Sequence, residues 1–257
     1  MLLLMAIACR SPMYPPVPTD GDPRKAYTAF LQHVVTEDGY VDYNAVEANR
    51  TPLDRMVAWI ASEESYKGKK ARHRHAYWLN AYNTLVLFQV MERDRPSSVL
   101  EPDGWLPFEG SAFFMETTFD VGGNRYSLAE IEHERIRHME LDFRDHAAMN
   151  CASMSCPPLR NELYKTDQLQ AQLREQMERW VMDDNRGVRI EDGVGVFNPI
   201  FDWFQRDFVF TSAGMSICEI AATYSEGDKK AQLEALVEAG CPHRFFDYDW
   251  SLNDISR

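Results

Sequence analysis

The residues best suited to chemistry lie between positions 145 and 160, in the segment D-H-A-A-M-N-C-A-S-M-S-C-P-P-L-R. It holds an imidazole (His146), an amide (Asn150) and two thiols (Cys151 and Cys156), a dense set of reactive groups for a structural turn. A cysteine beside an imidazolium ionises more readily, so the segment could supply a nucleophile and its base. The two prolines after Cys156 restrict the backbone and hold that thiol at a chain reversal.

Two local patterns indicate how these groups are presented. Alternating small and apolar residues from His146 to Cys151 predict a short buried strand. The segment S-L-A-E-I-E-H-E-R-I-R-H, residues 127–138, opens with a capping-box pattern and predicts a helix. Glu132 lies on that helix and is a candidate for binding a substrate or bracing the site.

A third element, the stretch 71–92, is apolar nearly all round and predicts a buried central helix. Asn80 and Asn83 lie three residues apart on it and share one face. Because buried amides need hydrogen-bond partners, these two side chains either brace neighbouring loops or line a pocket.

The rest of the chain alternates between helical and hairpin patterns. Amphipathic periodicity predicts helices, and glycine turns between apolar runs predict hairpins near 117–126 and 188–197. The aromatic C-terminal tail, R-F-F-D-Y-D-W-S-L-N-D, should dock into the core. We therefore predict an α+β fold: one helix-rich domain over residues 23–257, with a small antiparallel sheet and the buried central helix.

Composition excludes several classes of function. At 45% hydrophobic residues, the 257-residue chain can bury a full core as one domain. The formal net charge of −13 argues against a nucleic-acid partner, because phosphate binding needs a basic patch. The histidines lack the close spacing of metal ligands, and no motif indicates a cofactor.

The N-terminal residues 1–9, M-L-L-L-M-A-I-A-C, resemble the end of a bacterial lipoprotein signal, although no positively charged region precedes them. We expect Cys9 to be lipidated, with the proline-rich residues 10–22 as a tether to the periplasmic face of a membrane. The other four cysteines permit disulfides in an exported protein, and Cys218 and Cys241 could pair.

Four separated blocks together resemble the bacterial and plant domain-of-unknown-function 547 family. They are A-Y-W-L-N-A-Y-N (76–83), S-L-A-E-I-E-H-x-x-I-R (127–137), H-A-A-M-N-C-A-S-M-S-C-P-P-L (146–159) and Y-D-W-S-L-N (248–253). The resemblance implies a shared fold and candidate positions, and it carries no established reaction.

The order of elements is also similar to that of papain- and transglutaminase-type thiol enzymes. Those folds place a nucleophilic cysteine at the start of a buried helix and a histidine at the opening of a later strand. Here the helix carries Asn80 and Asn83 and no cysteine, and an amide cannot serve as the attacking thiolate. Any nucleophile must therefore be Cys151 or Cys156, or the site binds without catalysing.

Two hypotheses follow. In the first and favoured one, the chain is a binding or scaffold module for a periplasmic protein or a small molecule, with Cys151 and Cys156 bridged or inert. In the second it is a thiol-dependent hydrolase or acyl transferase. Cys156 would then be the nucleophile and His146 the base. Asn80 or Asn83 would orient the base or stabilise an oxyanion.

Overall fold

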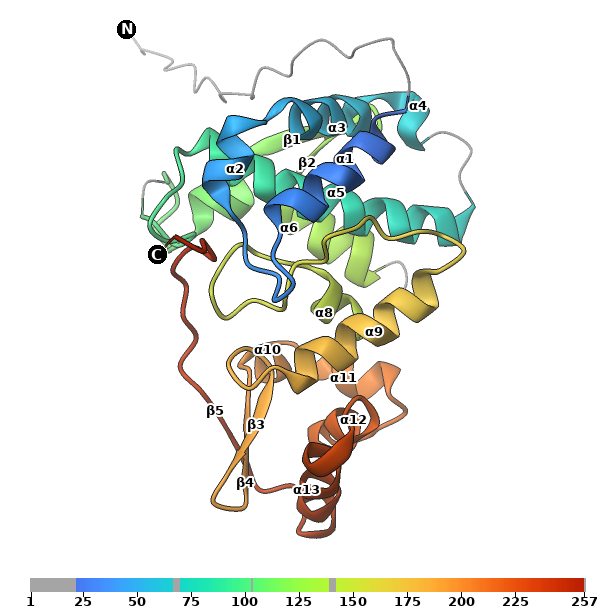
Figure 1. Ribbon diagram of the computed structural model, residues 1–257, viewed down its shortest axis with the longest axis vertical. Helices are drawn as coiled ribbons and strands as arrows, with labels where there is room; N and C mark the ends of the chain where they lie inside the picture. Colours follow the sequence, from blue (N-terminus) through green and yellow to red (C-terminus); the bar gives the residue numbers. More distant parts are fainter. Residues whose placement is uncertain (1–21, 67–69, 103, 139–141, 257) are drawn as a thin grey trace, which may run out of the picture.

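The computed structural model describes residues 22–66, 70–102, 104–138 and 142–256, and it is rich in helix with two small sheets (Figure 1). This confirms the predicted α+β class. The predicted helix over residues 71–92 coincides with α5. The α-helices are α1 (Pro23–Val34), α2 (Tyr43–Ala48), α3 (Thr51–Ala61), α4 (Glu63–Tyr66), α5 (Ala71–Glu92), α6 (Leu128–Glu130), α8 (Asp145–Ala148), α9 (Leu169–Met182), α10 (Ile200–Trp203), α11 (Gln205–Thr211), α12 (Ile217–Thr223) and α13 (Gly227–Glu238), and the π-helical segments are η1 (Ala112–Glu116) and η2 (Ile131–Arg137).

The strands form two separate sheets. Both predicted hairpins are confirmed: β1 (Thr118–Val121) pairs with β2 (Asn124–Ser127), and β3 (Val188–Glu191) pairs with β4 (Val194–Phe197), each pair antiparallel. The second sheet gains a parallel edge strand, β5 (His243–Phe245), which pairs with β4. The predicted small antiparallel sheet is present, and a second sheet is mixed because a strand from the distant C-terminal region joins its hairpin.

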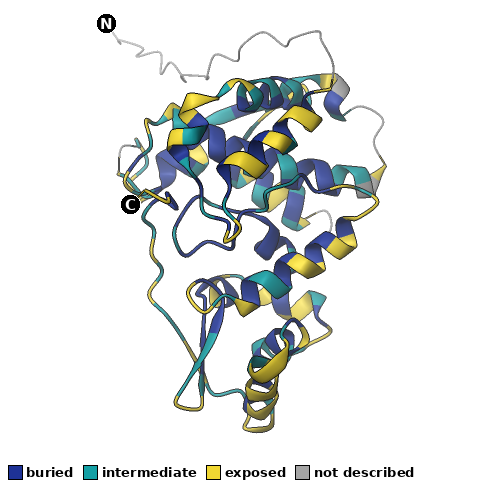
Figure 2. Ribbon diagram, in the orientation of Figure 1, coloured by how far each residue is buried: buried dark blue, intermediate teal, exposed yellow. Residues whose placement is uncertain are grey.

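The larger of two hydrophobic cores surrounds α5, which packs against α3 and η2. Side chains on all sides of α5 are buried, as the predominantly dark-blue helix in Figure 2 shows. Trp78 is 2% exposed, and its ring lies against those of Tyr66 and Tyr126 with centroids 5.5 and 5.4 Å away. The all-round apolar sequence of α5 explains its place inside the core.

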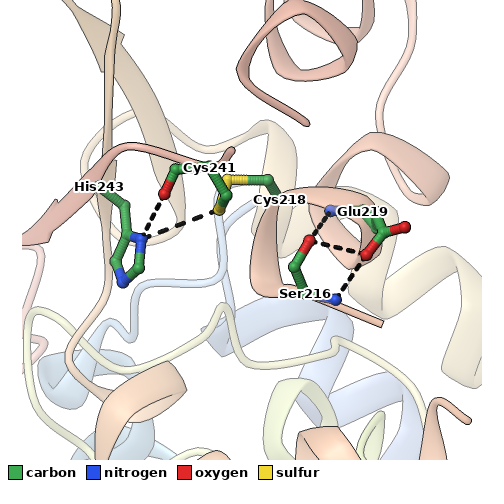
Figure 3. The surroundings of a disulfide bond; sticks show 5 residues. All are labelled: Ser216, Cys218, Glu219, Cys241 and His243. Carbon is green, nitrogen blue, oxygen red and sulfur yellow. Dashed lines mark hydrogen bonds between the residues drawn. A yellow bond between two sulfur atoms is a disulfide. The ribbon is translucent and has the colours of Figure 1, made fainter. Parts of the chain in front are cut away.

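A second core lies among α9, the β3–β4 hairpin and the helices α10 to α13. Trp180 of α9 stacks on Phe201 of α10 with ring centroids 4.7 Å apart. A disulfide between Cys218 and Cys241 joins α12 to the loop before β5 (Figure 3), which is one of the pairings that the sequence left open.

The C-terminal tail crosses from the second core to the first (Figure 1). Its backbone pairs with the segment that follows α8: the amide of Met154 donates to Ser251, and that of Asn253 donates to Ala152, at 2.8 and 3.0 Å. Leu252 is fully buried in the first core. The expectation that this aromatic tail docks is therefore confirmed.

The predicted strand from His146 to Cys151 is wrong. Residues Asp145–Ala148 form the single helical turn α8, and only Met149 after it is extended. Small residues such as Ala147 and Ala148 suit a helical turn as well as a strand, so the local alternation was ambiguous. Tertiary contacts decided the outcome, because Ala147 packs in the second core and Ala148 in the first.

The predictions for residues 1–9, including lipidation of Cys9, and nearly all of the predicted tether lie outside the described residues. Within the part of the chain that the structure describes, no helix is both long and apolar enough to cross a bilayer.

Candidate functional site: a thiol-lined cavity between the two cores

A cavity of about 230 Å³ lies where side chains from both cores meet. Four of the predicted site residues line it: Glu132 from η2, His146 from α8, and Cys151 and Cys156 from the following segment. Aromatic side chains make much of its wall; they are Tyr82, Phe114, Trp203, Phe204, Tyr248 and Trp250.

Buried amides hold the thiol-bearing segment in place. Asn83 on α5 donates to the carbonyl of Ala148 at 2.8 Å and accepts from the amide of Asn150 at 2.9 Å. The side chain of Asn150 in turn donates to Pro157 at 2.7 Å and accepts from the amide of Ala152 at 2.9 Å. Asn83 and Asn150 therefore brace the turn that presents the thiols, and neither lines the 230 Å³ cavity.

Asn80 lies apart from the thiols. It accepts from the amide of Tyr164 at 2.8 Å and donates to the carbonyl of the same residue at 2.9 Å. It lines a different cavity of about 590 Å³, which contains no thiol. Two cations at that larger cavity are already paired, Arg24 with Asp22 and Lys165 with Glu162, so its charged groups are less available for a ligand.

Cys156 is a buried thiol with little capacity to ionise. Its side chain is 3% exposed, and its sulfur accepts a hydrogen bond from the backbone amide of Cys151 at 2.7 Å. Burial raises the pKa of Cys156 well above its usual value, and the neighbouring Cys151 raises it further. The thiol that the sequence favoured as nucleophile is therefore held neutral near pH 7.

Cys151 has the opposite character. The residue is half-buried, and its sulfur lies 3.1 Å from the hydroxyl of Ser153 and 3.4 Å from that of Tyr248. Burial acts to raise the pKa of Cys151, but hydrogen bonds from Cys156, Ser153 and Tyr248 outweigh it and lower the pKa to about 7. Both thiols are free, so no bridge joins Cys151 to Cys156.

The backbone between these residues is strained. Ala152 has a φ of 64°, a left-handed conformation that is costly for a residue with a β-carbon. Strained backbone of this kind is concentrated at functional sites, where surrounding structure enforces it. The tail supplies that enforcement, because the carbonyl of Ala152 accepts from Asn253 at 3.0 Å.

His146 is oriented by an acidic residue. Its Nε2 lies 2.8 Å from the carboxylate of Asp207 on α11, and its ring stacks on Phe204 with centroids 4.3 Å apart. Asp207 also accepts from Arg137 at 2.6 Å. Although burial raises the pKa of Asp207, its bonds to His146 and Arg137 dominate and lower it, so the carboxylate is ionised.

An ionised carboxylate can only accept, so the proton of a neutral His146 ring lies on Nε2 and Nδ1 is left as an acceptor. That is the tautomer of an oriented general base. Among the contacts of the described residues, however, no hydrogen bond joins the ring to either thiol. The structure brings His146, Cys151 and Cys156 to one cavity, but His146 is not hydrogen-bonded to either cysteine as a catalytic pair would be.

Three participants were absent from the sequence-based prediction: Asp207, Ser153 and Tyr248. Tyr248 stands in the block Y-D-W-S-L-N that carried the family resemblance, so a signal existed for it. Asp207 lies 61 residues from His146, and nothing in its local sequence relates the two. Within the described residues, no group of three or more His, Cys, Asp or Glu side chains is placed to hold a metal ion.

Residues 67–181 match the family described as "Protein of unknown function, DUF547". The predicted resemblance is thereby confirmed over that range, which contains both thiols, His146 and Glu132. The match ends before Tyr248, which lines the cavity, and before Asp207, which contacts His146. No curated protein and no solved structure matches the chain.

Proposed function

We propose that the chain is a binding module whose 230 Å³ cavity takes a small, mainly apolar ligand. The observation that carries this proposal is the composition of the cavity: aromatic walls with a few convergent polar groups, at the junction of two cores. Concave sites of this composition are the usual ligand sites of proteins, and the volume limits the ligand to a small molecule.

The bracing of the site supports the same conclusion. Asn83 and Asn150 hold the thiol segment through hydrogen bonds to its backbone, and the tail holds it from the other side. A cavity that is already ordered costs little conformational entropy when a ligand enters. This network therefore favours a preformed site.

A neutral fluorescent dye, N-phenyl-1-naphthylamine, tests the proposal. We expect the protein to bind the dye, and Ala129→Trp, which places an indole at the cavity wall, to abolish binding. Ala235→Trp on the exposed face of α13 is the matched control and should bind as the unaltered protein does. Dye binding that survives Ala129→Trp would show that the cavity is not the binding site.

A second candidate, thiol-dependent hydrolysis or acyl transfer, is favoured by one specific observation: an ionisable thiol and an aspartate-oriented imidazole line the same cavity. Cys151 rather than Cys156 would attack the carbonyl, since only its thiolate forms near pH 7. The ester C–O bond would break with loss of the alcohol or phenol, and water, or an acceptor in acyl transfer, would then cleave the thioester and restore the thiol. Hydrolysis of p-nitrophenyl acetate should then be lost in Cys151→Ser and kept in Cys156→Ser. Equal activity in both variants would exclude this role for Cys151.

We also propose that the protein is exported and is anchored to a membrane through a lipid on Cys9. The lipoprotein-like residues 1–9 and the proline-rich residues 10–22 support it. The Cys218–Cys241 disulfide supports export too, because disulfides persist in oxidising compartments. The ligand would then be a small molecule, or part of a protein, of the periplasm.

A further inference from the structure

Glu132 is a carboxylate at the cavity wall, and among the described residues no lysine or arginine forms an ion pair with it. Its side chain is 18% exposed and accepts only a long hydrogen bond, 3.4 Å, from Tyr82. Among the described residues, the nearest cationic candidate is His133, whose Nδ1 lies 3.9 Å from Glu132.

The same nitrogen of His133 is engaged by Arg137. Its Nδ1 lies 2.6 Å from a guanidinium nitrogen of Arg137, and a guanidinium can only donate. In this contact the Nδ1 of His133 accepts from Arg137 and does not donate to Glu132. Arg137 itself is paired with Asp207 at 2.6 Å. The negative charge of Glu132 is thus left for a ligand to balance, and a partly buried charge without a partner is costly.

The neighbouring walls are also suited to a cation. Trp203, Tyr248 and Trp250 line the cavity as one aromatic cluster whose rings pack on one another, with centroids 4.4 to 5.5 Å apart. A ligand in the cavity can meet only the outer faces and edges of this cluster, and aromatic ring faces attract ammonium groups. The formal net charge of −13 adds a long-range attraction for cations over anions.

We infer that the cavity binds a small organic cation of the alkylammonium class, with its charged head against Glu132 and its alkyl groups against Trp203, Tyr248 and Trp250. This inference rests on the proposed ligand-binding function and names the chemical class of its ligand. Aromatic walls offer an ammonium few hydrogen-bond acceptors, which favours a methylated head group over a bare amine. Such a group occurs both in free molecules and in lipid head groups.

Calorimetric titration with choline and with its neutral analogue 3,3-dimethylbutan-1-ol tests the inference. The two probes share a shape and differ in charge, so we expect choline to bind about tenfold more tightly. A ratio of this size lies within what cation–π contacts and charge pairing contribute to binding. Glu132→Gln should weaken choline binding about tenfold and leave the neutral analogue unchanged. Glu134→Gln, an exposed position on the same helical segment, is the matched control and should change neither.

A further arm with phosphatidylcholine vesicles separates the two sources of the cation. Vesicle binding that is lost in Glu132→Gln, without binding of free choline, would assign a lipid head group; binding of free choline assigns a soluble ligand. Equal affinity for choline and its neutral analogue would overturn the charge-based inference while leaving the cavity a binding site. If the protein binds neither choline, nor its neutral analogue, nor the vesicles, the inference is overturned. The dye experiment then shows separately whether the cavity binds a ligand at all.

Discussion

Cys151 and Cys156 stand five residues apart and differ in their ability to ionise. The difference arises from their contacts: hydrogen bonds from Cys156, Ser153 and Tyr248 lower the pKa of Cys151, whereas burial and the neighbouring Cys151 raise the pKa of Cys156 despite the backbone amide at its sulfur. Each hydrogen-bond donor stabilises a thiolate and burial destabilises it, so the balance of these two effects sets the pKa of the cysteine. Reactivity at this site is therefore a property of Cys151.

We predict that iodoacetamide labels Cys151 with a rate midpoint near the lowered pKa of about 7, and not near the usual value of about 8.5. Tyr248→Phe removes a donor to the thiolate and should move the midpoint upward. Labelling should be absent in Cys151→Ser and retained in Cys156→Ser. A midpoint near 8.5 in the unaltered protein would contradict the proposed hydrogen bonding of Cys151.

Asp207 links His146 to Arg137, and its pKa is lowered by these two contacts. A lowered folded-state pKa means that the unfolded chain binds more protons as the pH falls below about 4, where a free aspartate titrates. The stabilisation by Asp207 is therefore complete at pH 7 and is lost progressively below pH 4.

We predict that Asp207→Asn lowers the melting temperature at pH 7 and that the difference from the unaltered protein narrows at pH 3. Thermal unfolding at both pH values measures this. Asp202→Asn, an exposed position on α10, is the matched control and should show a smaller change. A difference that stays constant between pH 7 and pH 3 would show that Asp207 does not titrate as described.

At the scale of elements, α5 organises the first core and also supplies Asn83 to the thiol segment. The loss of packing within α5 should therefore affect both stability and the site. Because interiors are close-packed, a large side chain removed from this helix leaves a cavity that its neighbours fill only in part.

We predict that Trp78→Ala costs about 3–5 kcal/mol of unfolding free energy, the range for large aromatic side chains removed from a core. Urea denaturation measures the change. Trp105→Ala is the matched control, because the Trp105 side chain is 75% exposed and its removal should leave stability nearly unchanged. A loss below about 1 kcal/mol for Trp78→Ala would refute the central packing role of this residue.

At the scale of the whole molecule, the two cores meet at the cavity, and the chain passes between them at α8, along α9 and in the tail, of which α8 and the tail carry cavity residues. These residues are His146 on α8, and Tyr248 and Trp250 on the tail. The site is therefore a consequence of how the two halves of the chain assemble.

The proposed anchor also belongs to this scale. When the protein is expressed with its native start, we expect it to fractionate with membranes, and Cys9→Ser to release it into the soluble fraction. The lipid on Cys9 is the physical reason, since the described residues contain no helix that could cross a bilayer. Cys151→Ser serves as the matched thiol control. Unchanged membrane association of Cys9→Ser would refute lipid anchoring at this residue.

Much of the architecture follows from local patterns in the sequence. The apolar run of α5 predicted a buried helix with the correct bounds, because a helix without a polar face has to be enclosed. Glycines at positions 122, 123 and 193 marked the turns of the two hairpins, where a positive φ is required. Three of the reactive residues between positions 145 and 160, His146, Cys151 and Cys156, lie at the wall of the candidate cavity.

Only the tertiary structure decided the chemistry of that wall. The hydroxyl group near the Cys151 sulfur comes from Tyr248, 97 residues away, and the orientation of His146 depends on Asp207, 61 residues away. Periodicity reports which face of an element is apolar and carries no information about such distant partners. The helical conformation of α8 also depends on tertiary contacts. A short run of small residues is compatible with helix or strand, and here its residues pack into both cores as a helical turn.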